Sequence, residues 1–410
     1  MEASTNKSRE QLESRHILIE HPQANEDFVS SIKEKMKDIS SSETIFMVPE
    51  KLRTGNEKVY IPDKVSIGPL HHGISTLTAM EDHKWRYLYA LLSRKPNLEG
   101  ILDGCVKALR ELEQRARKCY AKEFDQLTAD QFVEMMLVDG CFIIELLCKY
   151  VVKGLRCRND PIFTTPGMLL SIRCDIILSE NQIPLFILRN LFEIVPIPRQ
   201  CKDQTLNELA FRFFRNMLPC DEEVVNEKIS QEGNHLLDLI SHFYLPSYPR
   251  EQVKQSGSSE VIECAKMLQE AGIRFRKVTA KSVLDIMFFD GVIEIPPLKI
   301  YRFSEVLFAN LIALEQHNCD MQYVTSYAFL MSALIRSDKD ARLLRRHRIL
   351  ISNEYKDIKD VYESFQKYKW EEVNVKDLYY AGLFEQINDQ YRRRNWSAWL
   401  GNLKHKLCHS

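Results

Sequence analysis

The chain has 410 residues, of which 45% are hydrophobic and 28% are charged, so it can build a sizeable core and is not a disordered protein. Lys and Arg number 56 and Asp and Glu number 57, and the formal net charge of -1 gives no reason to expect nucleic acid as a partner. The eleven cysteines contain no C-x-x-C pair, which argues against a zinc ribbon or a thioredoxin-like redox site and favours reduced thiols in the cytoplasm.

The first segments of the chain predict little regular structure. Residues 1–42 form a polar N-terminal arm, with no apolar run of the kind that a secretory signal needs and with one stretch of helical spacing over 25–39. Residues 43–75 contain three prolines and three glycines. That density of helix breakers predicts an extended strap.

Helical periodicity begins at Thr76 and dominates the next part of the chain. The clearest helix covers 128–150, where Thr128 and Gln131 have the spacing of a capping box. No stretch reaches the roughly 18 consecutive apolar residues of a membrane helix. Further helical segments are predicted over 101–121, 168–193 with a break at Pro184, 202–218, 232–244, 304–336 and 355–395.

A polar, Ser-rich linker at 251–260 precedes a change of period. Residues 273–278 and 291–301 alternate in the manner of strands, and we predict that they pair as a small antiparallel sheet. The expected fold is mainly α, one large helical domain with this β element and the N-terminal strap. It spans 43–400, with a helical part at 43–250 and a second part at 261–400, and 401–410 form a tail.

The strap ends in a stretch with two glycines, a proline and two adjacent histidines, VSIGPLHHGIS. Gly68 and Gly73 have the spacing of a phosphate-binding loop. Ile74 replaces the lysine that such a loop needs, and Pro69 lacks a backbone N–H donor. The chain contains no G-x-G-x-x-G either, so no nucleotide and no other cofactor is predicted.

A metal site in the same stretch is also not predicted. His71, His72 and His83 lie near Glu81 and Asp82. Adjacent histidines in extended backbone point to opposite sides, so one metal rarely binds both, and no H-E-x-x-H occurs. We interpret the stretch as a structural corner, in which one imidazole is buried and the other faces solvent.

Carboxylates among apolar side chains are the candidates for acid–base chemistry. Asp139 lies on the apolar face of 128–150, Glu180 lies in LSENQIPLFIL, and Glu315 lies on an apolar helical face. Such a group must be paired, hydrogen-bonded or protonated. In an enzyme, these three with His71 and His72 would be the catalytic candidates. The interpretation we favour is a structural polar network.

The last candidate site in the sequence is a short basic run. Arg342, Arg345, Arg346 and Arg348 fall within seven residues. The simplest interpretation is a solvated helix face. The alternative is contact with an anionic membrane surface, where each cation adds roughly 1 kcal/mol.

Several long motifs in order resemble the plant domain-of-unknown-function 247 (DUF247, UPF0481-like) family. The resemblance covers about residues 44–400 and is carried by IFMVPEKLR, YIPDKVSIGPLHHG, MMLVDGCFIIELL, LSENQIPLFIL and SVLDIMFFDGVIEIPPL. The sequence departs from the family pattern at Ser179, where leucine is usual, and at Leu70, where an aromatic residue is common. Family members continue past a Trp-rich segment into a C-terminal membrane helix, whereas this sequence stops at LGNLKHKLCHS after Trp396 and Trp399.

The resemblance implies an interaction or signalling protein of plant defence and recognition, at the inner face of the plasma membrane, with a protein partner. It implies no defined reaction, and we favour a protein that is not an enzyme. The alternative is a soluble paralogue that has lost its anchor and acts as a cofactor-independent cyclase or isomerase on a small apolar metabolite.

Overall fold

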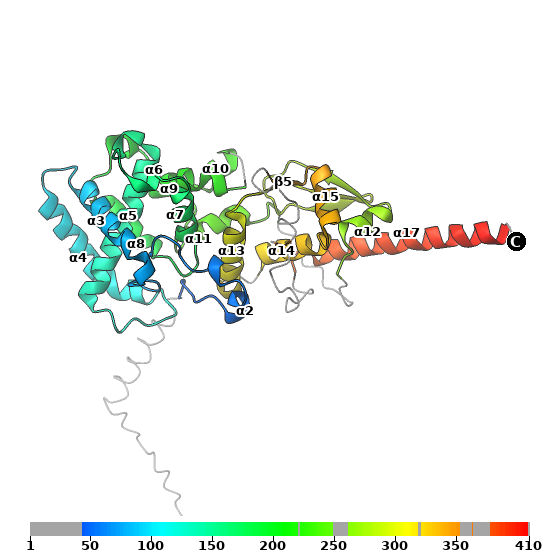
Figure 1. Cartoon of the computed structure of the whole chain (residues 1–410), viewed down its shortest axis with the longest axis horizontal. Coiled ribbons are helices and arrows are strands. Elements are labelled where there is room, and N and C mark those ends of the chain that lie inside the picture. Colours follow the sequence, from blue (N-terminus) through cyan, green and yellow to red (C-terminus); the bar gives the residue numbers. More distant parts are fainter. Residues whose placement is uncertain are drawn as a thin grey trace, which may run out of the picture. The chain divides into compact units, whose positions relative to one another are not determined.

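The computed structural model describes residues 43–219, 222–248, 261–318, 321–352, 363 and 378–408, with side chains as far as 394 in the last helix. The predicted arm at 1–42 with its helix over 25–39, the linker at 251–260, most of the predicted helix at 355–395 and the side chains of Trp396 and Trp399 lie outside the described residues. From Glu43 onward the chain folds as one unit of mostly helical structure with two small sheets (Figure 1).

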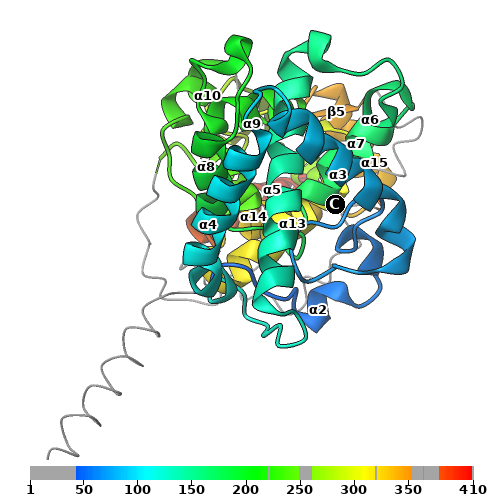
Figure 2. The same ribbon diagram turned by 90° about the vertical axis from the view of Figure 1, so that its left-hand side faces the viewer.

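The capping box predicted at Thr128 begins helix α5 (Ala129–Val151), and both of its reciprocal hydrogen bonds are present. This helix is buried on all sides from Met135 to Lys149, because other helices pack around it. Figure 2 shows α5 between α3 (Thr78–Leu92) and α4 (Leu98–Arg117). Helices α8 (Leu185–Ile194) and α9 (Leu206–Phe214) also pack on it.

Several of the other helices lie in predicted helical segments, whereas short ones such as Pro161–Thr164, Glu222–Lys228 and Ala265–Glu270 were not predicted. The segment predicted over 168–193 is two helices, and Pro184 is the N-cap of the second, α8. The first 250 residues add α2 (Glu50–Arg53), α6 (Pro161–Thr164), α7 (Met168–Ile176), α10 (Glu222–Lys228) and α11 (Leu236–Ser241). The later part of the chain adds α12 (Ala265–Glu270), α13 (Ser304–Asn318), α14 (Tyr323–Leu334), α15 (Asp338–Arg346) and α17 (Ala381–Cys408).

Short 3-10 helices join several of these elements, and two lie inside the strap or at its end. They are η1 (Glu57–Val59), η2 (Ser75–Leu77), η3 (Lys153–Leu155), η4 (Arg199–Cys201), η5 (Arg215–Met217) and η6 (His242–Tyr244). The prediction that 43–75 contains no helix was therefore wrong for Glu50–Arg53 and Glu57–Val59. Single turns need few consecutive residues, so they fit between the helix breakers.

The two predicted strand segments do pair with each other, but the predicted antiparallel direction was wrong. Strand β1 (Arg274–Lys277) pairs with β3 (Val292–Ile295) in parallel, and β2 (Met287–Phe289) pairs with β3 antiparallel. Asp290 and Gly291 both have positive φ, as a tight two-residue hairpin turn requires. This hairpin places β2 along one edge of β3, so β1 pairs with the other edge of β3. The extended run after β3 forms β4 (Leu298–Ile300), which pairs in parallel with β5 (Leu350–Ser352).

Helix α17 is the last element described and contacts β2. Its first half carries Asn388, Asp389 and three consecutive arginines. Within the described ranges, α17 and the other helices all fall short of the combined length and apolarity that crossing a bilayer requires.

Candidate functional site

The buried segment between α7 and α8 holds the strap through polar side chains. Glu180 is 2% exposed, and its Oε1 atom accepts a hydrogen bond from the backbone N–H of Val48 at 2.6 Å and another from the Arg53 guanidinium. Water does not compete for these bonds in the interior, so each is stronger than it would be at the surface. Glu180 therefore fixes the start of the strap to the helical core.

Two neighbouring side chains fix the middle of the strap. Asn181 accepts a hydrogen bond from the N–H of Ile67 at 2.7 Å and donates to the carbonyl oxygen of Val65 at 3.0 Å. Asp175 accepts from the three consecutive N–H groups of residues 63–65 at 2.7 to 2.9 Å. Burial raises the pKa of Asp175 to about 6, although the three backbone donors act in the opposite direction.

Asp139 forms a buried ion pair with Lys84 beneath the end of the strap. The Lys84 ammonium lies 2.7 Å from Asp139 Oδ1 and 2.8 Å from Glu81, and the N–H of Gly68 donates to Asp139 Oδ2 at 2.8 Å. Burial raises the pKa of Asp139, and Lys84 opposes this shift. Burial would lower the pKa of Lys84, but Asp139 and Glu81 raise it above its ordinary value, so the ammonium stays protonated.

Four of the five catalytic candidates come together as two pairs, and Glu315 belongs to neither pair. The imidazole of His71 lies 3.7 Å from Glu180, and burial lowers its pKa. His72 is exposed and lines a small cavity of about 220 Å³ together with Asp139. Both oxygens of Asp139 already accept hydrogen bonds, from Lys84 and Gly68.

Glu315 lies on α13 and holds the start of α14. Its carboxylate accepts hydrogen bonds from the N–H groups of Val324 and Thr325 at 2.7 and 2.8 Å and from the Thr325 hydroxyl at 2.8 Å. The carboxylate thereby supplies acceptors to N–H groups that lack partners in the first turn of a helix. Burial nevertheless raises the pKa of Glu315 to about 7.

This raised pKa predicts a pH effect on stability. The folded protein binds more protons at Glu315 than the unfolded chain between the ordinary pKa of 4.5 and about 7. The free energy of unfolding should therefore fall as the pH rises through this window, by up to about 1.4 kcal/mol per pH unit. Urea denaturation at pH 5, 6 and 7 measures the free energy of unfolding of the wild type and of Glu315→Gln. The value for the wild type minus that for the variant should fall as the pH rises. A value that stays constant with pH would contradict the assignment.

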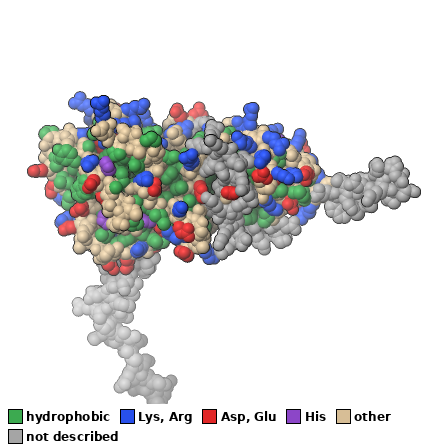
Figure 3. Space-filling model, in the orientation of Figure 1, with side chains coloured by type: hydrophobic (Ala, Val, Ile, Leu, Met, Phe, Trp, Pro, Cys, Tyr) green, Lys and Arg blue, Asp and Glu red, His purple; other side chains and the backbone are tan. Residues whose placement is uncertain are grey.

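The basic run lies on α15 and the turn after it. Arg342, Arg345, Arg346 and Arg348 are all exposed, and Arg342 pairs with Asp338 at 3.0 Å. Figure 3 shows Lys and Arg side chains at the surface in this part of the molecule. Contact with an anionic membrane stays a prediction.

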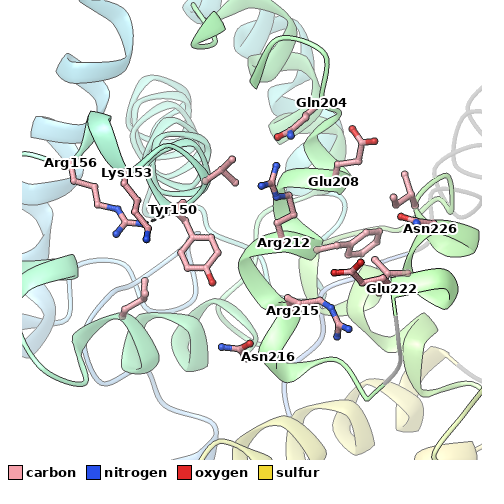
Figure 4. Close-up of a pocket in the computed structure, with 15 residues that line it drawn as sticks. Tyr150, Lys153, Arg156, Gln204, Glu208, Arg212, Arg215, Asn216, Glu222 and Asn226 are labelled. Carbon is pink, nitrogen blue, oxygen red and sulfur yellow. Dashed lines mark hydrogen bonds between the residues drawn. The ribbon is translucent and has the colours of Figure 1, made fainter. Parts of the chain in front are cut away.

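A cavity of about 680 Å³ lies among the end of α5, η3, α9, η5 and α10, and we call it the α9 cavity (Figure 4). Its charged lining residues are Lys153, Arg156, Glu208, Arg212, Arg215 and Glu222. Two of these have structural partners. Arg156 donates to the carbonyl oxygens of Lys149 and Tyr150, each at 2.8 Å, and Glu208 completes a capping box with Thr205.

A second cavity, of about 850 Å³, adjoins the first, because Arg215 and Asn216 line both. We call it the Arg173 cavity, after the α7 residue in its wall. Its other walls come from η5, the end of β1, β4 and the start of α13.

Sequence reasoning did not single out either cavity. The available signal is a lone arginine in an apolar helix, Arg173 within MLLSIRCDI, and two arginines among aromatic residues in FRFFRN. A cation in such a setting must be compensated or must face a cavity. Residues 173, 215 and 299 are far apart in the chain, so only the fold reveals that they share a wall.

The family model and the curated relatives that match this chain agree with each other. The DUF247 family model, described as a plant protein of unknown function, matches residues 45–410. UPF0481 protein At3g47200 of Arabidopsis thaliana is 31% identical over 382 residues, covering 87% of this chain and 79% of that protein. Putative UPF0481 protein At3g02645 of the same plant is 22% identical over 457 residues, covering 88% and 84%. No solved structure matches. The chain belongs to the DUF247 family of plant proteins, whose function is unknown.

Proposed function

We propose that this protein acts by binding a protein partner, in plant recognition or defence signalling, and not by catalysis. The placement of the buried carboxylates supports this proposal. Asp139, Asp175, Glu180 and Glu315 are all engaged by backbone N–H groups, so their lone pairs hold the fold together. A general base needs a lone pair that is directed at a substrate.

An apolar groove on the surface is the observation that carries the proposal. Helices α3 and α4 both pack on α5, and a groove of about 400 Å³ lies between them. We call it the Trp85 groove. Its apolar lining consists of Trp85, Leu88, Tyr89, Leu92, Leu98, Leu102, Val106, Val133 and Leu137.

Two aromatic side chains of the Trp85 groove are left in solvent. Trp85 is 47% exposed and Tyr89 is 68% exposed. Exposed Trp and Tyr beside an apolar floor are typical of protein-binding surfaces, where they supply most of the binding energy. Arg110, Asp130 and Glu134 give the groove a polar rim.

The occupant we infer is an amphipathic helix of the partner. A groove between two helices with a third as its floor has the shape that accepts a further helix, with apolar anchors three and four residues apart. The mixed charges on the rim match a helix whose polar face carries both signs.

The test compares three immobilised proteins in extracts of the source tissue, with quantitative mass spectrometry. The double variant Trp85→Ala/Tyr89→Ala should lose a defined set of proteins that the wild type retains. The control Phe289→Ala, which removes a 78% exposed aromatic residue on β2, should retain that set. A peptide from the retained partner, helical when bound, should then bind the wild type at least about tenfold more tightly than the double variant.

Three outcomes would overturn the proposal. The first is an identical set of bound proteins for the wild type and the double variant. The second is a partner peptide that binds both proteins equally. The third is concentration-dependent dimerisation of the wild type, absent in the double variant, because a second copy of the chain would then fill the groove.

A further inference from the structure

Arg173 is a buried cation without a hydrogen-bond acceptor for two of its nitrogens. The residue is 7% exposed, and its Nε and Nη2 atoms meet no acceptor among the residues that the structure describes. The guanidinium carbon lies 4.7 Å from the ring centre of Tyr150 and 4.8 Å from that of Phe213. These rings hold the guanidinium plane in place but do not neutralise its charge.

The buried Lys side chains among the described residues are compensated. Lys84 pairs with Asp139 at 2.7 Å, and Lys149 pairs with Asp160 at 2.9 Å. An isolated buried charge is costly, and arginine is too basic to escape the cost by losing its proton. Burial lowers the pKa of Arg173, as expected where the interior disfavours the charged form. The position therefore favours a ligand that supplies the missing negative charge.

The Arg173 cavity has the composition expected of an anion site. Its lining includes Arg173, Arg215, Lys277 and Lys299, and no Asp or Glu lines it within the described part of the chain. Most of the remaining wall is apolar or aromatic, with Leu170, Met217, Val283, Leu307, Phe303 and Phe308. One sign of charge in a concave, apolar wall concentrates the field on a bound anion.

We propose that the Arg173 cavity binds a small organic acid, with its carboxylate facing Arg173 and its apolar body against the wall formed by Leu307 and Phe308. The positive charges of Arg173, Arg215, Lys277 and Lys299 all act on a carboxylate in this cavity. The volume of about 850 Å³ suits a molecule of ordinary metabolite size. This site is separate from the Trp85 groove, so it goes beyond the partner-binding role.

The first test is isothermal titration calorimetry of the full chain with two carboxylates and their matching amides. Sodium octanoate and sodium 2-naphthoate share the carboxylate and differ in the apolar body, so their comparison separates a chain-like ligand from a ring-like one. Octanamide and 2-naphthamide are the neutral matches. At least one carboxylate should bind, and its amide should bind at least about tenfold more weakly. Equal affinity for acid and amide, or no heat from either acid at millimolar concentration, would overturn the proposal.

The second test locates the site. Arg173→Met keeps the length of the side chain and removes its charge, so carboxylate affinity should fall at least about tenfold while the midpoint of thermal unfolding stays within about 3 °C of the wild type. Arg212→Met, in the neighbouring α9 cavity, is the matched control and should bind the acid as the wild type does. Unchanged affinity in Arg173→Met would place the acid elsewhere and refute the assignment.

Two additional variants keep the result unambiguous. Lys277→Gln/Lys299→Gln changes exposed residues at the mouth of the cavity and should weaken acid binding several-fold even if Arg173→Met does not fold. Unchanged affinity in this double variant would also count against the site. Trp85→Ala/Tyr89→Ala should bind the acid normally, so failure of the partner proposal and failure of this one are distinguishable.

Discussion

Replacing Asp139 with alanine is expected to lower the free energy of unfolding by about 3–5 kcal/mol. The reason is that Lys84, which is 0% exposed, would remain buried with only Glu81 as a counter-charge, and the N–H of Gly68 would lose its acceptor. Urea denaturation, with far-UV circular dichroism as the signal, measures the change.

Two controls separate the ion pair from other effects of the substitution. Asp130→Ala removes a carboxylate from the same helix, but its pair with Arg110 is exposed, so the loss should stay below about 1 kcal/mol. The double variant Asp139→Leu/Lys84→Met replaces both charges with apolar groups and should recover much of the stability. A loss of less than 1 kcal/mol in Asp139→Ala would show that the pair does not support the fold.

Replacing Gly68 with alanine is expected to cost more than about 4 kcal/mol. Gly68 has a φ of +75°, a conformation that costs an L-residue about 1–2 kcal/mol. In addition, a Cβ atom at this position would overlap the backbone carbonyl oxygen of Gln182, which also accepts a hydrogen bond from the Tyr120 hydroxyl at 3.0 Å. The strap would have to move away from the core, which would break the bond from Gly68 to Asp139.

Gly73 offers a matched control a few residues later. Its φ is +79°, nearly the same as that of Gly68, but a Cβ atom there would meet open space. Gly73→Ala should therefore cost only the conformational part, about 1–2 kcal/mol. The difference between the two variants isolates the close approach of the strap to Gln182. Equal losses in both would contradict that approach.

The local part of the fold could be predicted from the sequence. The capping box at Thr128 and the break at Pro184 are signals that act within a few residues, and both appear where the pattern places them. The direction of β1 could not be predicted from its own pattern, because it depends on which edge of β3 the hairpin leaves open. The Asp290–Gly291 dipeptide is the signal that would have located the hairpin.

The partners of the buried carboxylates could be predicted only in kind. The apolar setting of Asp139 and Glu180 implies that each needs a partner, but Lys84 and Val48 are identified only by the fold. For the same reason the sequence did not reveal that Arg173 lacks a carboxylate partner among the described residues. That property depends on segments that meet from distant parts of the chain.

The strap also has a consequence for how the protein is made on the ribosome. Val48 bonds to a residue 132 positions later, Asp63 to one 112 positions later, and the carbonyl of Val59 to Asn310, 251 positions later. The N-terminal segment therefore leaves the exit tunnel long before its acceptors and donors have been synthesised. Contacts this distant in sequence slow folding. A nascent chain of this protein should thus depend on chaperones until its second half has emerged.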